Sequence, residues 1–488
     1  MIRIVAVIAC LAAICLNTPS VVICMADEPR GTTLPEPTRW VAELLQTDGR
    51  CGLEVISAEQ VKGGVEVICK LQYPDIHGET VEGRMKLYLP ERLETDGVTA
   101  APLVHVAGYE AERGSGEGLI ANGVVVCTPH EEPNNPLVRG ESLDVAILHR
   151  VRALPFIDDS KVIVLGGSAG GYMTLLLAAE SFPLSCCAPD VPPVNVGYNV
   201  AYLMHNRALA SAQPEGRDHM NMPVLNAVTP LGEFASALCG TDYDSDVWMA
   251  CSPIARMDEV TCPAIITCST ADLLVPAEQF GPEIAREVDP ELFPEGFEMR
   301  MEALLSRTSS RRTLLEVLDP QRVEVFTVPV PEGAPRLGWD GAAEGGAAAV
   351  NVPLPFSKDR QISLVVVDEG APEPQCGHTK HAIGLDKMAF LLHHHAAPLS
   401  PEQLTLPKLC RLMQRYLHLE AHAQILRPAE APAPFPANRL DFEEAERADV
   451  LRGLRTYGKD PVCRDRLQEL YSQLPEGLKA LGPAPPEQ

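Results

Sequence analysis

A glycine turn around one serine, set between an apolar strand and an apolar helix, constrains this fold more than any other feature. Val162 to Leu165 suit a central parallel strand that is covered on both faces. Gly166 and Gly170 then frame Ser168 in the pattern Gly-x-Ser-x-Gly. Such a turn, the nucleophile elbow, presents the serine hydroxyl over the N-terminus of the next helix. We therefore predict a nucleophilic serine at 168, the alternative being an ordinary turn whose serine only caps the helix.

The first 26 residues have the composition of an export signal. Arg3 is their only charged residue, residues 4–16 form an apolar run, and small residues precede Asp27. This pattern is typical of a secretory signal peptide, and its apolar core is short for a membrane span. We expect a secreted or periplasmic protein with no membrane span after signal cleavage. An uncleaved anchor is the alternative.

Charge and cysteine usage narrow the possible partners and cofactors. The net charge of −26 disfavours binding to nucleic acid and to anionic membrane surfaces. No two of the fifteen cysteines have the C-x-x-C spacing of zinc or thioredoxin-type sites. The sequence implies no metal and no organic cofactor, so we expect neither. Export favours disulfides, with Cys51 and Cys69 as the first candidate pair. The cysteines at 186–187 and at 262 and 268 can equally be small buried apolar residues.

Short apolar strands alternate with helices along much of the chain. This alternation indicates an α/β fold with a mostly parallel, doubly wound sheet, preceded by antiparallel edge strands. The expected edge strands are 53–56, 65–71 and 85–90, the sheet strands are 103–106, 123–129, 162–165, 184–191, 264–269, 323–328 and 361–367, and a helix is expected at 144–154.

These elements divide the chain into four parts. They are the signal 1–26, a lead-in with edge strands 27–100, the sheet-forming domain 101–395 and a C-terminal helical extension 396–488. Two insertions fall in the third part. Residues 195–250 are expected to cap a pocket, or else to be a surface excursion, and 277–320 to form a long helical excursion. The glycine- and alanine-rich stretch 338–349 is expected to be a flexible loop.

An elbow serine requires an acid and a histidine from later in the chain. A base must take the serine proton, and a carboxylate must orient that base and stabilise its charged form. Asp272 follows the strand 264–269 and His378 follows the last strand, which places both at carboxyl ends of strands. Asp190 and Asp258 compete as the acid, and Asp272 could instead cap a helix. His381 competes as the base.

The tetrahedral oxyanion of acyl transfer requires two N–H donors. One is expected from Ala169, directly after the nucleophile, and the other from the loop after the strand 103–106. We assign the second donor to the backbone of Tyr109. The alternative is that the Tyr109 ring only lines the pocket.

Several motifs together resemble a known enzyme family. Gly166 to Met173, Ser252-Pro253-Ile254, Thr270-Ala271-Asp272 with Val275-Pro276, and Gly377-His378 are similar to the catalytic domain of the prolyl oligopeptidase family of serine peptidases. That family belongs to the α/β-hydrolase superfamily. The resemblance covers about residues 100–395. It implies an α/β-hydrolase fold with inserted helical cap segments, Ser168 as nucleophile, Asp272 as acid and His378 as base.

The sequence also departs from that family. Residues 27–100 are too few for the N-terminal β-propeller of such peptidases, and the segment between Asp272 and His378 is longer than usual. A chain without a propeller is similar also to secreted carboxylesterases and to carbohydrate esterases of the acetyl or xylan type. We therefore expect an exported serine hydrolase that acts on a peptide or ester bond of a small substrate. A non-catalytic binding protein on the same fold is the alternative.

Overall fold

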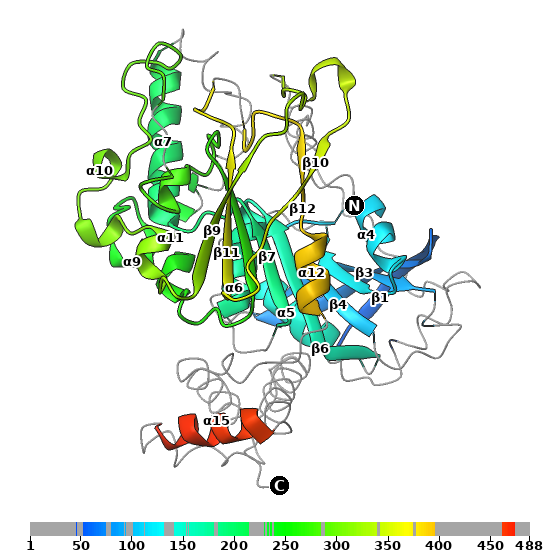
Figure 1. Cartoon of the computed structure of the whole chain (residues 1–488). Coiled ribbons are helices and arrows are strands. Elements are labelled where there is room, and N and C mark those ends of the chain that lie inside the picture. Colours follow the sequence, from blue (N-terminus) through cyan, green and yellow to red (C-terminus); the bar gives the residue numbers. More distant parts are fainter. Residues whose placement is uncertain are drawn as a thin grey trace.

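A computed structural model describes the body of the chain (Figure 1). The described residues are 45, 52–74, 80–91, 93, 101–111, 113–130, 141–152, 154, 156–179, 184–213, 229, 232–233, 235–236, 239–284, 288–338, 342–373, 377–395 and 461–473. The signal 1–26 and most of the extension 396–488 lie outside them. One helix of that extension, α15 (Pro461–Ser472), is described.

Ten strands of the described chain form one sheet, in the order β1-β2-β3-β5-β4-β6-β7-β8-β11-β9. The strands from β1 to β3, and the pair β3 and β5, are antiparallel, and all other neighbours are parallel. The expected α/β fold with a mostly parallel sheet and an antiparallel edge is therefore confirmed. The strands are β1 (Glu54–Val61), β2 (Gly64–Pro74), β3 (Thr80–Pro90), β4 (Ala101–Val106), β5 (Val125–Pro129), β6 (Ile157–Gly167), β7 (Cys186–Asp190), β8 (Ala264–Ser269), β9 (Val323–Pro329) and β11 (Ile362–Asp368).

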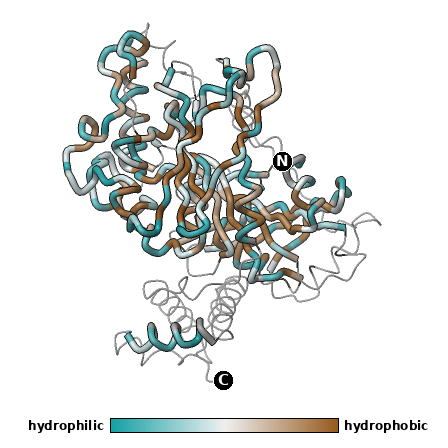
Figure 2. The backbone as a smooth tube through the Cα atoms, in the orientation of Figure 1, coloured by the Kyte–Doolittle hydropathy of each residue, from teal (hydrophilic) through white to brown (hydrophobic). Residues whose placement is uncertain are grey.

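The sheet separates two hydrophobic cores, because alternate residues of a strand point to opposite faces. Leu103 and Val162 belong to the larger core, to which α5 (Glu141–Arg152) and α6 (Ala169–Ala179) contribute. Val104 and Ile163 belong to the smaller core, which Phe390 of α12 (Met388–His395) helps to form. Figure 2 shows hydrophobic residues gathered along the sheet between these layers. Burial on both faces explains why the central strands are apolar throughout.

The segment 277–320 is not the long helical excursion that we expected. Its described residues contain only short helices, η5 (Ala277–Gln279), α10 (Met301–Leu304), η6 (Thr308–Ser310) and α11 (Leu314–Val317). Prolines at 282, 290 and 294 interrupt the segment, and proline in a helix interior removes a hydrogen bond and clashes with the preceding turn. In the other insertion, α7 (Val196–Ala212) contacts both α9 (Asp246–Ala250) and α10 (Figure 1).

A second, two-stranded sheet was not predicted. It pairs β10 (Val350–Pro353) in parallel with β12 (Ile383–Asp386). The remaining described elements are α4 (Arg113–Ile120), η4 (Pro253–Arg256) and η7 (Glu344–Gly346). Residues 342–349 lead directly into β10, and Leu337 forms a bridge to Ala343. The described part of the expected flexible loop 338–349 is therefore attached to ordered structure.

Of the expected disulfide between Cys51 and Cys69, Cys51 lies outside the described residues. Cys69 is a free, buried thiol in β2, where its side chain packs in the larger core. The cysteines at 186, 187, 262 and 268 are also buried thiols, as the alternative interpretation expected. Among the described residues no helix is long and apolar enough to cross a membrane.

Candidate active site

Ser168 occupies a strained turn between β6 and α6. Its φ of 55° is in the left-handed region, which a residue with a Cβ rarely adopts. The turn also needs its glycines: a Cβ at Gly166 would lie 2.5 Å from the Gly170 carbonyl oxygen, and one at Gly170 would lie 2.4 Å from the Ala107 carbonyl oxygen. The Ser168 N–H donates to the Asp190 carbonyl oxygen at 2.8 Å, which fixes the turn against β7. This is the geometry of a nucleophile elbow.

The structure brings the predicted acid and base to this serine. His378 Nε2 lies 3.1 Å from Ser168 Oγ, and His378 Nδ1 lies 2.8 Å from Asp272 Oδ2. Asp272 and His378 are 1% and 5% exposed, so water does not compete strongly for these hydrogen bonds. The other Asp272 oxygen accepts from the N–H groups of Leu274 and Val275, each at 2.8 Å. The hydrogen-bonded triad of Ser168, His378 and Asp272 can therefore pass a proton from serine to histidine.

The electrostatics of Asp272 combine two opposing effects. Burial raises its pKa above the ordinary value, whereas His378 and the two backbone N–H groups favour the carboxylate and oppose that rise. A carboxylate in this position selects the tautomer of His378 with the proton on Nδ1, which leaves Nε2 free to accept the serine proton.

The structure places the alternative acids, Asp190 and Asp258, and the alternative base, His381, in other surroundings. Asp190 Oδ1 pairs with Lys387 Nζ at 2.5 Å and accepts from Thr267 Oγ1 at 2.7 Å, behind the elbow. Asp258 is exposed. His381 Nδ1 lies 3.1 Å from Glu369 Oε2. In the part of the chain that the structure describes, no side chain of these three residues is hydrogen-bonded to Ser168; only the backbone carbonyl oxygen of Asp190 is.

Both residues predicted to form the oxyanion hole lie beside Ser168. Ala169 follows it directly in the chain, and Tyr109 approaches it with its side chain. The Tyr109 phenol interacts with the Ser168 side chain and the Ala169 N–H, and both interactions favour its ionised form. Burial raises the pKa of Tyr109 to about 12, so the phenol keeps its proton at neutral pH. Our prediction assigned the backbone of Tyr109, whereas in the structure its side chain interacts with Ser168. The sequence could identify the residue but not the direction of its ring.

Sequence reasoning missed the residues that hold the histidine loop. Glu369 is buried and accepts from Ser269 Oγ at 2.6 Å, from Lys380 N–H at 2.8 Å and from His381 N–H at 3.0 Å. The inserted chain before β10 adds hydrogen bonds from Leu337 N–H to the Lys380 carbonyl oxygen and from Ala382 N–H to the Pro335 carbonyl oxygen, at 2.8 and 2.7 Å. The only signal was the position of Glu369 after a buried strand.

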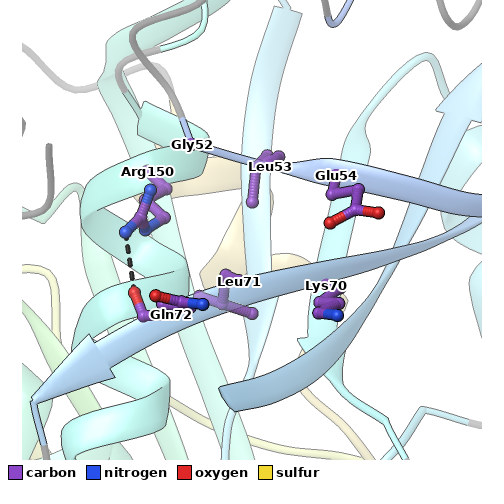
Figure 3. A pocket seen from close by; sticks show the side chains of 7 residues that line it. All are labelled: Gly52, Leu53, Glu54, Lys70, Leu71, Gln72 and Arg150. Atoms are coloured by element: carbon purple, nitrogen blue, oxygen red, sulfur yellow. Dashed lines mark hydrogen bonds between the residues drawn. The ribbon is translucent and has the colours of Figure 1, made fainter. Parts of the chain in front are cut away.

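A pocket elsewhere on the protein does not belong to this site. It measures about 240 Å³ and lies where β1, β2 and α5 meet, with Leu53, Lys70, Gln72 and Arg150 among its lining residues (Figure 3). Arg150 donates to the Gln72 carbonyl oxygen at 2.7 Å. Within the described ranges, no group of three or more His, Cys, Asp and Glu side chains is arranged to hold a metal ion.

Comparisons with known proteins give likenesses of fold at low identity. No protein-family model and no curated protein matches the sequence. The acylaminoacyl peptidase of Pyrococcus horikoshii, in its orthorhombic crystal form, is 11% identical over 47% of this chain and 42% of that chain, with a TM-score of 0.31. Acetyl xylan esterase 1 from Thermoanaerobacterium sp. JW/SL YS485 is 14% identical over 50% of this chain and 82% of that chain, with a TM-score of 0.29.

A second esterase structure is similar to the same extent. The acetyl xylan esterase from Paenibacillus sp. R4 is 11% identical over 51% of this chain and 84% of that chain, with a TM-score of 0.29. The aligned region spans less than half of the Pyrococcus peptidase.

Proposed function

We propose that this protein is an exported serine hydrolase that works through an acyl-enzyme. The observation that carries the proposal is the hydrogen-bonded row of Ser168, His378 and Asp272. A serine hydroxyl is a weak nucleophile until a neighbouring base accepts its proton, and this row supplies both the base and its orienting acid. The strained elbow, which exposes the hydroxyl above the start of α6, supports the same role.

The reaction proceeds in two halves. Ser168 Oγ attacks the substrate carbonyl carbon while its proton passes to His378 Nε2. The oxyanion accepts hydrogen bonds from the Ala169 N–H and from Tyr109. The tetrahedral intermediate collapses, its bond to the leaving amine or alcohol breaks, and His378 gives its proton to that group. Water then attacks the acyl-enzyme in the same way and releases the carboxylic acid and free Ser168.

The substrate is a small molecule with a peptide or an ester bond. The motif resemblance to the prolyl oligopeptidase family supports a peptide. One structural observation favours an ester as the second candidate: β1, β2 and β3 join the main sheet, so residues 54–90 do not form a separate domain that filters peptides. The two candidates share the nucleophile and differ in the leaving group.

The first experiment compares wild type with Ser168→Ala on p-nitrophenyl acetate and on a short peptide p-nitroanilide. Loss of the triad serine lowers kcat by about 10⁶-fold in a serine protease, so we expect no measurable turnover by the variant. The ratio of the two wild-type activities separates esterase from peptidase. A fluorophosphonate probe should label wild type and leave Ser168→Ala unlabelled. If folded wild type resists the probe, the protein is instead a binding protein on a hydrolase fold.

Export is a separate proposal that rests on residues 1–26. We expect protein recovered from the periplasm or the medium to begin near residue 27. N-terminal sequencing of that protein would show an intact Met1 if the segment is retained as an anchor.

A further inference from the structure

The loop that carries Tyr109 is held by buried side chains from two neighbouring elements. This oxyanion loop, residues 107–111, joins β4 to α4. Thr128, the residue before the last of β5, donates from Oγ1 to the Tyr109 carbonyl oxygen at 2.7 Å and accepts from the Ala111 N–H at 3.0 Å. On the other side of Tyr109, the Gly108 N–H donates to Asp144 Oδ2 of α5 at 3.1 Å. The peptide groups around Tyr109 are therefore fixed on both sides.

Both supporting side chains are fully enclosed by protein. Thr128 and Asp144 are each 0% exposed. The two hydrogen bonds of the Thr128 hydroxyl both go to the oxyanion loop. Asp144 Oδ1 lies 2.7 Å from Nε2 of the equally buried His105. A buried polar group that loses its partner costs free energy, so these side chains and the loop hold each other in one arrangement.

The loop also lies directly against the elbow. Gly108 has a φ of +78°, and a Cβ there would lie 2.7 Å from Gly170 Cα. The Gly108 backbone therefore packs closely against the elbow, which limits movement of the loop toward the serine. Displacement away from the serine is opposed by the hydrogen bonds of Thr128 and Asp144. The loop that carries Tyr109 is thus held by two residues that are closed off from solvent and have no hydrogen bond to Ser168.

We propose that Thr128 and Asp144 are positioning residues that preorganise Tyr109 for stabilisation of the oxyanion. The inference rests on the proposed serine hydrolase function and extends it to residues outside the catalytic row. Donors that are fixed before reaction need no reorganisation as charge develops, and this accounts for their large effect on rate. A displacement of about 1 Å can cost about 100-fold in rate. Loosening the loop should therefore impair transition-state stabilisation more than substrate binding.

The test compares Thr128→Val with Thr128→Ser. Valine keeps the shape and removes the hydroxyl, whereas serine keeps the hydroxyl. With p-nitrophenyl acetate, we expect Thr128→Val to lower kcat by about tenfold or more with little change in KM, and Thr128→Ser to stay close to wild type. Phenylboronic acid forms a tetrahedral adduct with a serine nucleophile, so its Ki should rise by the same factor as kcat/KM falls.

A matched control removes another buried hydroxyl. Ser185 donates from Oγ to the Ser160 carbonyl oxygen at 3.1 Å. It lies just before the amino end of β7, whereas Ser168 follows the carboxyl end of the parallel strand β6. Ser185→Ala should leave kcat and the boronate Ki unchanged even if it lowers the melting temperature. If Thr128→Val does not fold, Asp144→Leu provides the second test: it removes the acceptor of the Gly108 N–H, and we expect the same loss of kcat.

Two results overturn the inference. Folded Thr128→Val with wild-type kcat and boronate Ki shows that the hydroxyl does not position Tyr109, and an equal loss of activity in Thr128→Val and Ser185→Ala shows a general effect on stability. Failure of the underlying function looks different. In that case wild type and Ser168→Ala behave alike toward ester and fluorophosphonate, whatever stands at position 128.

Discussion

At the scale of single residues, two histidines separated by three positions have different partners. His378 lies between Ser168 and Asp272, whereas His381 lies on Glu369. We expect His378→Ala to lower kcat by at least about 10⁴-fold, because the serine loses its base. His381→Ala should retain kcat within about tenfold, since Lys380 N–H and Ser269 still hold Glu369. Ester kinetics and fluorophosphonate labelling of both variants check this assignment, which is wrong if His381→Ala is the more damaged.

The order and type of the three central residues could be predicted, because an elbow serine demands an acid and then a histidine at strand ends. Tyr109 was predicted as a residue but only with its backbone, since a sequence does not determine the rotamer of a ring. Asp190 was a reasonable alternative acid because it lies at the end of a strand. It is engaged by Lys387, which is 197 positions away in the chain and has no recognisable link to it in the sequence.

At the scale of elements, the strands were predicted well and the inserted segments poorly. Long apolar runs such as β8 and β11 are buried on every residue and have a strong sequence signal. The pair β10 and β12 consists of four-residue strands whose partners are distant in the chain, and such pairing has no local signature. In 277–320, helix-forming residues suggested helices that prolines prevent.

Glu110 connects the oxyanion loop, of which it is part, to β3 and to the residue after β5. Its ion pairs make the free energy of unfolding depend on pH. It follows the oxyanion loop's Tyr109 and contacts Lys86 of β3 at 2.5 Å and His130, next to β5, at 2.8 Å. Burial raises the pKa of Glu110, but the hydrogen bonds with His130 and Lys86 outweigh burial and lower the pKa to about 2. The folded state therefore favours the carboxylate, and this stabilisation is complete above the ordinary value of 4.5 and is lost as pH falls toward 2.

Glu110→Gln should reproduce that loss at neutral pH. Because the side chain is 36% exposed, we expect the variant to be less stable than wild type at pH 7 by no more than about 1 kcal/mol. The difference should shrink as pH falls from 4.5 toward 2, since wild type then loses the same interactions. Denaturant unfolding of both proteins at pH 7, 4 and 3 measures it. A difference that is constant across this range would contradict the role of the carboxylate charge.

At the scale of the whole molecule, one sheet with two covered faces was predictable from the alternation of strands and helices. The ends of the chain were predicted from composition, and most of those residues lie outside the described ranges. The order in which the last strands sit in the sheet was not predictable, because several orders satisfy the same hydrophobic pattern. β9 precedes β11 in the sequence but lies beyond it, at the edge.

This order of β9 and β11 affects how the chain folds while it is being synthesised. While the chain emerges from the ribosome, β9 is complete before the only strand it pairs with in the described sheet exists, and His378 follows β11 later still. Contacts between distant parts of a chain form slowly, because loop closure costs entropy before any pairing repays it. On the proposed function, we therefore expect Ser168 to stay inert in the nascent chain until the final strands dock together. In refolding, fluorophosphonate labelling should recover only with the slowest phase of the circular dichroism signal, and earlier labelling would show that β9 and β11 are not needed to assemble the site.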